Sequence, residues 1–127
     1  MSSAKHDIQT REDVILLVNS FYEKVRENDT IGFIFDEVAK VDWEHHLPRM
    51  YNFWCSILLG EHSFSGNPMV KHIALSRQTT LSSVQFAEWL NLFKNTVDHL
   101  FDGRLANEAK MRAENIAQLM LFKIQTA

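Results

Sequence analysis

The sequence predicts an all-α protein, and three observations support that prediction. Apolar residues recur three and four positions apart along four long segments, as they do on the buried face of an amphipathic helix. No segment alternates apolar and polar residues in the way a half-buried strand does. The chain also contains only 4 Gly and 2 Pro, too few for a turn-rich β-barrel. Its 127 residues fit a single domain, with a polar leader at 1–10 and a helical core at about 11–125.

The first long helix is expected from residue 11 to about Asn28. Thr10 and Asp13 form a capping-box pattern, in which the threonine side chain accepts from a backbone N–H group that has no partner inside the helix. The segment from Asn28 to Gly32 then breaks the helix, and the short apolar stretch 32–35 is expected to form a compact turn. The apolar stripe of this helix comprises Val14, Leu17, Val18, Phe21 and Val25.

The second long helix is expected from about Trp43 to Leu59, with Gly60 at the position where a left-handed residue ends a helix. Pro48 complicates its start, because proline lacks an N–H group and clashes with the carbonyl group four residues back. Either the helix begins near His46, with Pro48 in its first turn, or it is kinked at Pro48. In either case His46 would lie at the mouth of a pocket rather than deep inside it.

Three further helices are expected. Pro68 at a first helical position starts a short one, from Met69 to about Leu75. Ser82 and Gln85 form a second capping box ahead of a third long helix that ends at Gly103. The last helix runs close to the C-terminus. The apolar stripe of the third long helix comprises Phe86, Trp89, Leu90, Phe93, Val97 and Leu100, and that of the last helix comprises Leu105, Ala109, Arg112, Ile116, Leu119 and Met120.

The charge balance and the single cysteine exclude several classes of protein. The net charge of −3 argues against a nucleic-acid binder, which usually has a basic face. With Cys55 alone there is no internal disulfide, which fits a reducing compartment. The N-terminus shows no secretion signal, and no apolar run approaches the roughly 20 residues that a membrane span needs. We therefore expect a soluble cytoplasmic protein with no nucleic-acid or membrane partner.

Six histidines and an aromatic set of 9 Phe, 3 Trp and 2 Tyr suggest a flat apolar cofactor held by an imidazole. The zinc-protease motif His-Glu-x-x-His and the paired Glu-x-x-His motifs of di-iron bundles are missing from the sequence. One cysteine makes a closed zinc site a weak hypothesis. The haem-attachment motif Cys-x-x-Cys-His is also missing, so any haem would be bound non-covalently.

Among the histidines, His72 stands out, whereas His6, His62 and His99 are expected at the surface. His72 lies in the middle of the expected short helix and shares its apolar face with Met69 and Leu75. Spacing alone favours a core histidine that donates to a backbone carbonyl group. A neutral imidazole on a short helix is also the arrangement that a haem iron needs as its proximal ligand.

His46, Tyr22 and Trp89 pose a similar question. His46 shares a helix face with Met50, and hence with Phe53 and Trp54, or it is a partly exposed histidine at a helix start. The ring of Tyr22 faces inward, so its hydroxyl group needs a partner, either a carbonyl group or water, or a polar molecule bound at a metal. The Trp89 indole N–H group poses the same question.

The order and spacing of several short motifs resemble a group III truncated haemoglobin. The resemblance runs from about Asp13 to Lys123. It implies a truncated globin fold, a two-over-two helical sandwich, so that residues 1–127 would form a single globin domain. The motifs are Phe21–Arg26, Gly32–Phe35, His46–Trp54, Leu58–Glu61, Lys71–His72 and the segment from Phe86 to Phe93 around Trp89.

The resemblance also implies a role for individual residues. His72 would be the proximal ligand of a b-type haem (heme b). Tyr22 and Trp89 would donate hydrogen bonds to a diatomic ligand at the iron, and His46 matches the distal histidine. The remaining residues would form the wall of the haem pocket, with Phe35 wedged against the porphyrin and the long Arg49 side chain able to reach a propionate: Phe35, Arg49, Met50, Phe53 and Trp54.

Donors of this kind slow ligand escape, so the resemblance implies a tight O₂ binder with slow release, which also takes NO and CO. Such a protein suits sensing, or redox chemistry with O₂, NO or peroxide, rather than transport. An enzymatic version, NO dioxygenation or peroxidase-like turnover, would take electrons from an external reductase. The alternative is a cofactor-free helical interaction module whose aromatic stripes are ordinary core.

Overall fold

Four helices make up most of the part of the chain that the computed structural model describes, which is residues 5–32, 34, 42–61 and 82–126. They are α1 (Arg11–Glu27), α2 (Trp43–Leu58), α4 (Ser83–Leu100) and α5 (Arg104–Thr126), and these ranges contain no strand. The predicted all-α class is therefore confirmed. The expected short helix at 69–75 lies outside the described residues.

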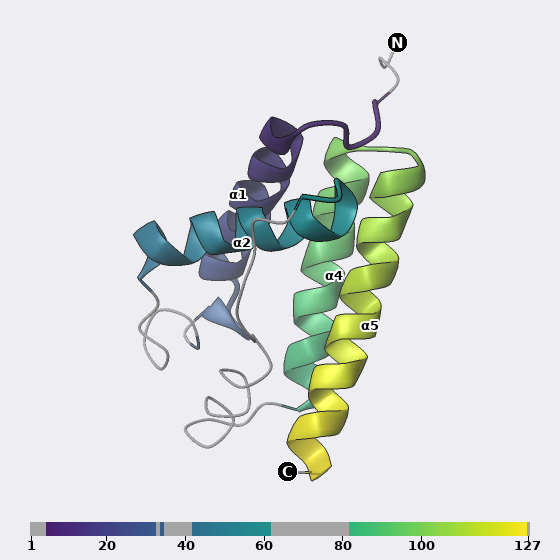
Figure 1. Ribbon diagram of the computed structural model, residues 1–127. Helices are drawn as coiled ribbons and strands as arrows, with labels where there is room; N and C mark the ends of the chain where they lie inside the picture. The colour runs from purple at the N-terminus through teal and green to yellow at the C-terminus, as the bar shows by residue number, and fades with distance from the viewer. Residues whose placement is uncertain (1–4, 33, 35–41, 62–81, 127) are drawn as a thin grey trace.

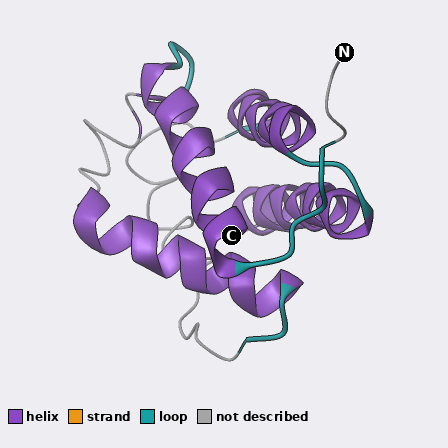
Figure 2. Ribbon diagram, turned by 90° about the horizontal axis from the view of Figure 1, so that it is seen from above, coloured by secondary structure: helices purple, strands orange, loops and turns teal. Residues whose placement is uncertain are grey.

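The helices form two pairs. α4 and α5 run antiparallel, side by side, while α2 crosses α1 beside them (Figure 1). Seen from above, α4 and α5 appear nearly end-on, with the crossed pair of α1 and α2 against them (Figure 2). α1 packs on both α2 and α4, so it joins the two pairs. This arrangement is a two-over-two helical sandwich. None of the described helices is long and apolar enough to cross a membrane.

Local signals in the sequence set both ends of α1. The Thr10 side chain accepts from the Asp13 N–H group at 3.3 Å, and the Asp13 carboxylate accepts from the Thr10 N–H group at 3.2 Å, so the predicted capping box is confirmed. At the other end, Asn28 Oδ1 accepts from the N–H groups of Thr30 at 2.8 Å and Ile31 at 3.1 Å. These bonds replace the helical pattern and turn the chain at the predicted position.

α2 begins at Trp43, which agrees with the expected start at about this residue. The alternative in which the helix begins near His46, three residues later, is wrong. The N–H group of His46 donates to the Asp42 carbonyl group at 2.8 Å, which is a regular helical bond. Pro48 therefore lies inside the helix. Its missing N–H group leaves the Glu44 carbonyl group without a helical partner. Both residues are exposed, so water can satisfy that carbonyl group.

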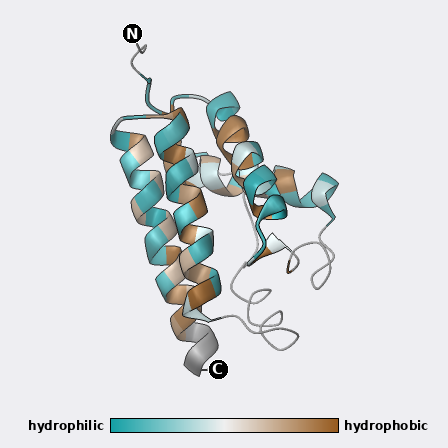
Figure 3. Ribbon diagram, turned by 180° about the vertical axis from the view of Figure 1, so that it is seen from behind, coloured by the Kyte–Doolittle hydropathy of each residue, from teal (hydrophilic) through white to brown (hydrophobic). Residues whose placement is uncertain are grey.

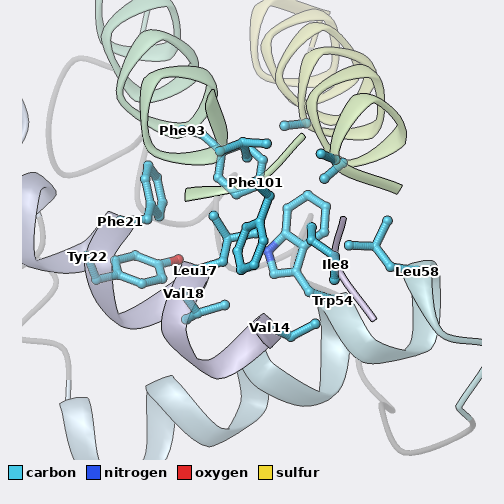
Figure 4. Close-up of a cluster of buried hydrophobic side chains, with 14 of the residues drawn as sticks. Ile8, Val14, Leu17, Val18, Phe21, Tyr22, Trp54, Leu58, Phe93 and Phe101 are labelled. Atoms are coloured by element: carbon cyan, nitrogen blue, oxygen red, sulfur yellow. The ribbon is translucent and has the colours of Figure 1, made fainter. Parts of the chain in front are cut away.

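The core lies where α1, α2 and α4 meet (Figure 4). Hydrophobic and polar positions alternate along each helix (Figure 3). Phe93 and Val97 of α4 are fully buried, and Trp54 of α2 is 4% exposed. The buried set shared by these three helices comprises Val14, Leu17, Val18, Phe21, Tyr22, Val25, Trp54, Cys55, Leu58, Phe93 and Val97.

The stripe that α5 buries differs from the expected one. Ala109 and Met120 are buried as expected, but Arg112 and Leu119 are exposed. Alanines at intervals of three and four take the inward positions, and their small side chains allow α4 to approach closely. The pattern of long apolar side chains misses a face built from small ones. The buried alanines of α5 are Ala106, Ala109, Ala113 and Ala117.

The segment before α1 was expected to be a polar leader, but part of it packs against the rest of the protein. Ile8 is 1% exposed and belongs to the core. The Asp7 carboxylate accepts from the backbone N–H groups of Leu105 at 2.9 Å and Ala106 at 2.8 Å, in the first turn of α5. A Cβ at Gly103 would lie 2.5 Å from Asp7 Cγ, so only glycine lets the carboxylate reach this helix start. Asp7 therefore acts as a helix cap supplied from the other end of the chain.

Substitution of Asp7 by alanine is expected to lower the free energy of unfolding by about 1 kcal/mol near neutral pH, the usual cost of losing a cap. Burial alone would raise the pKa of Asp7, but the N–H groups of Leu105 and Ala106 lower it below its usual value. The stabilisation is therefore present above about pH 4 and is lost as the pH falls through the folded-state pKa. Urea unfolding of both proteins at neutral and acidic pH measures this. A difference in stability that stays the same at both pH values would contradict it.

Candidate functional site

An aromatic cluster at the junction of α1, α2 and α4 brings together residues that the sequence singles out. Phe21 contacts the rings of Tyr22 and Trp89 edge-on, with centroid distances of 4.9 and 5.7 Å. Trp89 and Trp54 both stack on Phe93, at 6.0 and 4.8 Å. Tyr22 and Trp89 therefore belong to one continuous set of ring contacts, although 67 positions separate them in the sequence.

Tyr22 is the most buried polar member of this cluster. Its ring projects from α1 with the hydroxyl oxygen directed into the interior, and the residue is 8% exposed (Figure 4). Burial raises the pKa of the Tyr22 hydroxyl group well above its usual value, because the phenolate would lose its hydration. The group therefore stays protonated at physiological pH and can donate a hydrogen bond.

His46 packs directly against Tyr22. The two ring centroids are 5.2 Å apart, with the planes at 81°. His46 is half-buried, and its Nε2 atom is shielded from solvent. The helix start at Trp43 has a consequence here, because it places His46 in the fourth helical position, where its side chain is directed inward. The structure thus brings together two of the residues that the resemblance assigns to the distal side.

The apolar stripe of α4 changes character along the helix. Phe93 and Val97 are fully buried, whereas Phe86, Trp89 and Leu90 continue the same stripe but are only half-buried. A planar apolar group packed against this end of α4 would cover such side chains, so the residues present fit a haem. Met50 and Phe53 of α2 are also half-buried and pack against the core.

Two pocket residues proposed from the resemblance differ in their surroundings. Trp54 is buried among core residues and stacks on Phe93, with the ring planes at 18°. Arg49 is exposed on α2, so its guanidinium group is free to reach an anionic group at the surface. Phe35 and His72 lie outside the described residues, as does His62.

The other described histidines are at the surface. His6 and His99 are exposed, as predicted. His45 is exposed and its Nδ1 lies 2.6 Å from an Asp42 carboxylate oxygen. Within the described ranges, no three His, Cys, Asp or Glu side chains gather in a way that could hold a metal ion. Cys55 is buried, and burial raises the pKa of its thiol group, which keeps it in the unreactive protonated form.

Trp43 is a site residue that the sequence reasoning missed. Its ring centroid lies 5.4 Å from that of Tyr22 and 5.5 Å from that of His46. The Arg26 guanidinium group lies over the Trp43 ring, 4.9 Å from its centroid. One signal could have found it, because Trp43 precedes His46 by three positions and so shares its helix face. The uncertainty that Pro48 introduced about the first turn of the helix obscured that signal.

A solvent-open cleft of about 650 Å³ lies between α1 and α2. The Tyr51 hydroxyl group donates to Asn19 Oδ1 and so links the two helices at this cleft. The lining combines apolar and aromatic side chains with three charged ones, and it comprises Asn19, Tyr22, Glu23, Arg26, Glu27, Trp43, Leu47 and Tyr51.

Comparisons with known proteins agree with this fold. The model of the bacterial-like globin family matches residues 6–122. The group 3 truncated haemoglobin Ctb of Campylobacter jejuni is 32% identical over 125 residues, which cover 94% of this chain and 96% of that protein. A crystal structure of the group III truncated haemoglobin from Campylobacter jejuni has a TM-score of 0.81 at 29% identity, with 94% of each chain covered. The chain therefore belongs to the bacterial-like globin family and, within it, to the group III truncated haemoglobins.

Proposed function

We propose that this globin binds haem b non-covalently, with His72 as the proximal ligand, and takes O₂, NO or CO on the side where Tyr22, His46 and Trp89 lie. Membership of the globin family supports haem and gaseous-ligand binding. The observation that carries the distal assignment is the buried Tyr22 hydroxyl group beside the half-buried His46 ring. The assignment of His72 is supported by its place in the Lys71–His72 motif.

When bound, the haem iron supplies a coordination position that a diatomic ligand can occupy. The chain then provides hydrogen-bond donors on that side. Tyr22 is protonated at physiological pH, and burial raises its pKa further, so its hydroxyl group is available as a donor. The Trp89 indole N–H group is a donor only. A hydrogen bond to an acceptor with negative charge contributes about 1.5–3 kcal/mol, which is enough to slow ligand release substantially.

The remaining proposed residues hold the haem rather than its ligand. Met50 and Phe53 present half-buried apolar side chains that pack against the core. Phe35 and Trp54 complete the proposed wall, Phe35 by its place in the Gly32–Phe35 motif. The exposed Arg49 side chain is long enough to pair with a propionate at the pocket edge.

Tight hydrogen bonding suits sensing, or redox chemistry with O₂, NO or peroxide, better than O₂ transport. Any catalytic turnover would use electrons from an external reductase. Steady-state consumption of NO by the haem-loaded protein, with a chemical reductant present, separates a catalytic role from a ligand-binding role. Consumption of more than one NO molecule per haem-loaded chain indicates turnover.

Absorption spectroscopy tests haem binding itself. Titration of the purified protein with hemin is expected to give a Soret band that saturates at one haem per chain, with a further shift when CO is added to the reduced form. A protein that takes up no hemin would contradict the proposed function. That result would favour the alternative, a cofactor-free helical interaction module.

A further inference from the structure

Trp43 stands between the cleft and the proposed distal residues. On one side it contacts Tyr22 and His46, at centroid distances of 5.4 and 5.5 Å. It also lines the α1–α2 cleft, as does the Arg26 side chain that lies over its ring. Trp43 is only half-buried, whereas Tyr22 is 8% exposed. The indole ring is therefore part of the wall between solvent and the Tyr22–His46 pair.

The cleft reaches one member of that pair. Tyr22 is itself among the residues that line the cleft, and its hydroxyl group is directed inward. Among the residues that the structure describes, Trp43 is the aromatic side chain that contacts both Tyr22 and His46 and also lines the cleft.

The apolar part of the cleft lining favours the passage of uncharged molecules. Glu23, Arg26 and Glu27 carry the charged groups, and all three are exposed, whereas Leu47 and Trp43 supply a half-buried apolar surface. An ion that moved past the exposed residues would lose hydration against the apolar surface, which is costly. A small uncharged molecule such as a diatomic gas pays no such cost.

We propose that Trp43 is a positioning residue that fixes the Tyr22–His46 pair and closes an entrance for small neutral molecules from the α1–α2 cleft. The Arg26 guanidinium group braces the ring in its closed position. This inference rests on the proposed function and deepens it, because it assigns the control of ligand access at the same site.

Nitration of tyrosine tests the closure without any haem, because the chain has only two tyrosines and both line the cleft. Treatment of the full chain with tetranitromethane, followed by peptide mapping, is expected to modify the half-buried Tyr51 and to spare Tyr22. Trp43→Ala is expected to raise the nitration of Tyr22 severalfold relative to Tyr51. Trp43→Phe keeps an aromatic ring in place and is expected to restore protection.

Two further variants complete the test. Arg26→Gln removes the brace without touching the core. The extent of Tyr22 nitration in this variant is expected to lie between the extents in the wild type and in Trp43→Ala. Arg26→Gln therefore replaces Trp43→Ala in the test if the latter fails to fold. Phe122→Ala removes an aromatic side chain that is 60% exposed on α5 and does not line the cleft, so it is expected to leave Tyr22 nitration unchanged. Tyr22 that stays protected in both Trp43→Ala and Arg26→Gln would overturn the closure.

The entrance itself is tested in the haem-loaded protein by flash photolysis of its CO complex. Trp43→Ala is expected to increase the bimolecular CO association rate severalfold, and Trp43→Phe to leave it near the wild-type value. An unchanged rate in Trp43→Ala would overturn the entrance. Failure of the wild-type chain to take up haem would instead contradict the proposed function, and the nitration experiment distinguishes these two failures.

Discussion

Replacement of Tyr22 by phenylalanine is expected to speed O₂ dissociation from the haem-loaded protein roughly ten- to a hundredfold. The estimate follows from the loss of one hydrogen bond to an acceptor with negative charge, which is worth about 1.5–3 kcal/mol, where each 1.4 kcal/mol is a factor of ten. The ring of Tyr22 is buried among Phe21, Trp43 and His46, so removal of the hydroxyl group should leave the packing intact. Stopped-flow displacement of O₂ by CO measures the rate.

The chain supplies a matched control in its other tyrosine. Tyr51 lines the cleft, and its hydroxyl group donates to Asn19. Tyr51→Phe therefore makes the same chemical change away from the proposed distal side, and the O₂ dissociation rate should stay near the wild-type value. If Tyr22→Phe and Tyr51→Phe gave equal rates, the Tyr22 hydroxyl group would have no part in holding the ligand.

Replacement of His72 by alanine is expected to abolish the Soret band at hemin concentrations that saturate the wild-type protein. A non-covalent haem is held by its axial imidazole together with apolar contacts, so this substitution would remove the proposed coordinate bond between the chain and the iron. Addition of free imidazole should restore part of the band, because a small ligand can replace the missing side chain. Absorption spectra with and without imidazole measure both effects.

His99→Ala serves as the control for that experiment. His99 is exposed on α4 and lies near the end of the helix where α5 begins, so its loss should leave hemin uptake unchanged. Circular dichroism of both variants shows whether the helices persist. A wild-type Soret band in His72→Ala would remove this residue from the site and direct attention to His46.

The sequence predicted the helices well wherever a short-range signal was sufficient. The capping boxes at Thr10 and Ser82 involve residues three positions apart, and both form as expected. The turn at Asn28 depends on one side chain that bonds to the next backbone groups. Such signals are complete within a few residues, so no tertiary information is needed to read them.

Predictions that depended on the environment were less accurate. Pro48 was expected to lie in a first helical turn or at a kink. The first alternative is wrong, because propensity gives the cost of a proline but not whether water can offset it. The inward face of α5 was expected to contain Arg112 and Leu119, whereas small alanines occupy it, since close packing of α4 and α5 is a property of the pair. Neither outcome is encoded in a local pattern.

The candidate site was predictable only where spacing within one helix was sufficient. An inward-facing position for Tyr22 followed from helical spacing, whereas spacing left two alternatives open for His46. The structure packs the two rings together. The contact itself joins different helices, and spacing within one helix says nothing about which partner it meets. Trp43 was missed because its importance comes from its contacts with Tyr22 and Arg26 across that interface.

The Asp7 cap on α5 has a consequence for how the chain folds. Its bond to Leu105 joins residues that are 98 positions apart. Closing so long a loop costs more chain entropy than forming the contacts between α4 and α5, which are neighbours in the sequence. The N-terminal segment should therefore dock after the folding transition state, so that its loss accelerates unfolding while refolding proceeds at nearly the same rate. The residues before α1 thus govern the lifetime of the native state rather than the speed at which it is reached.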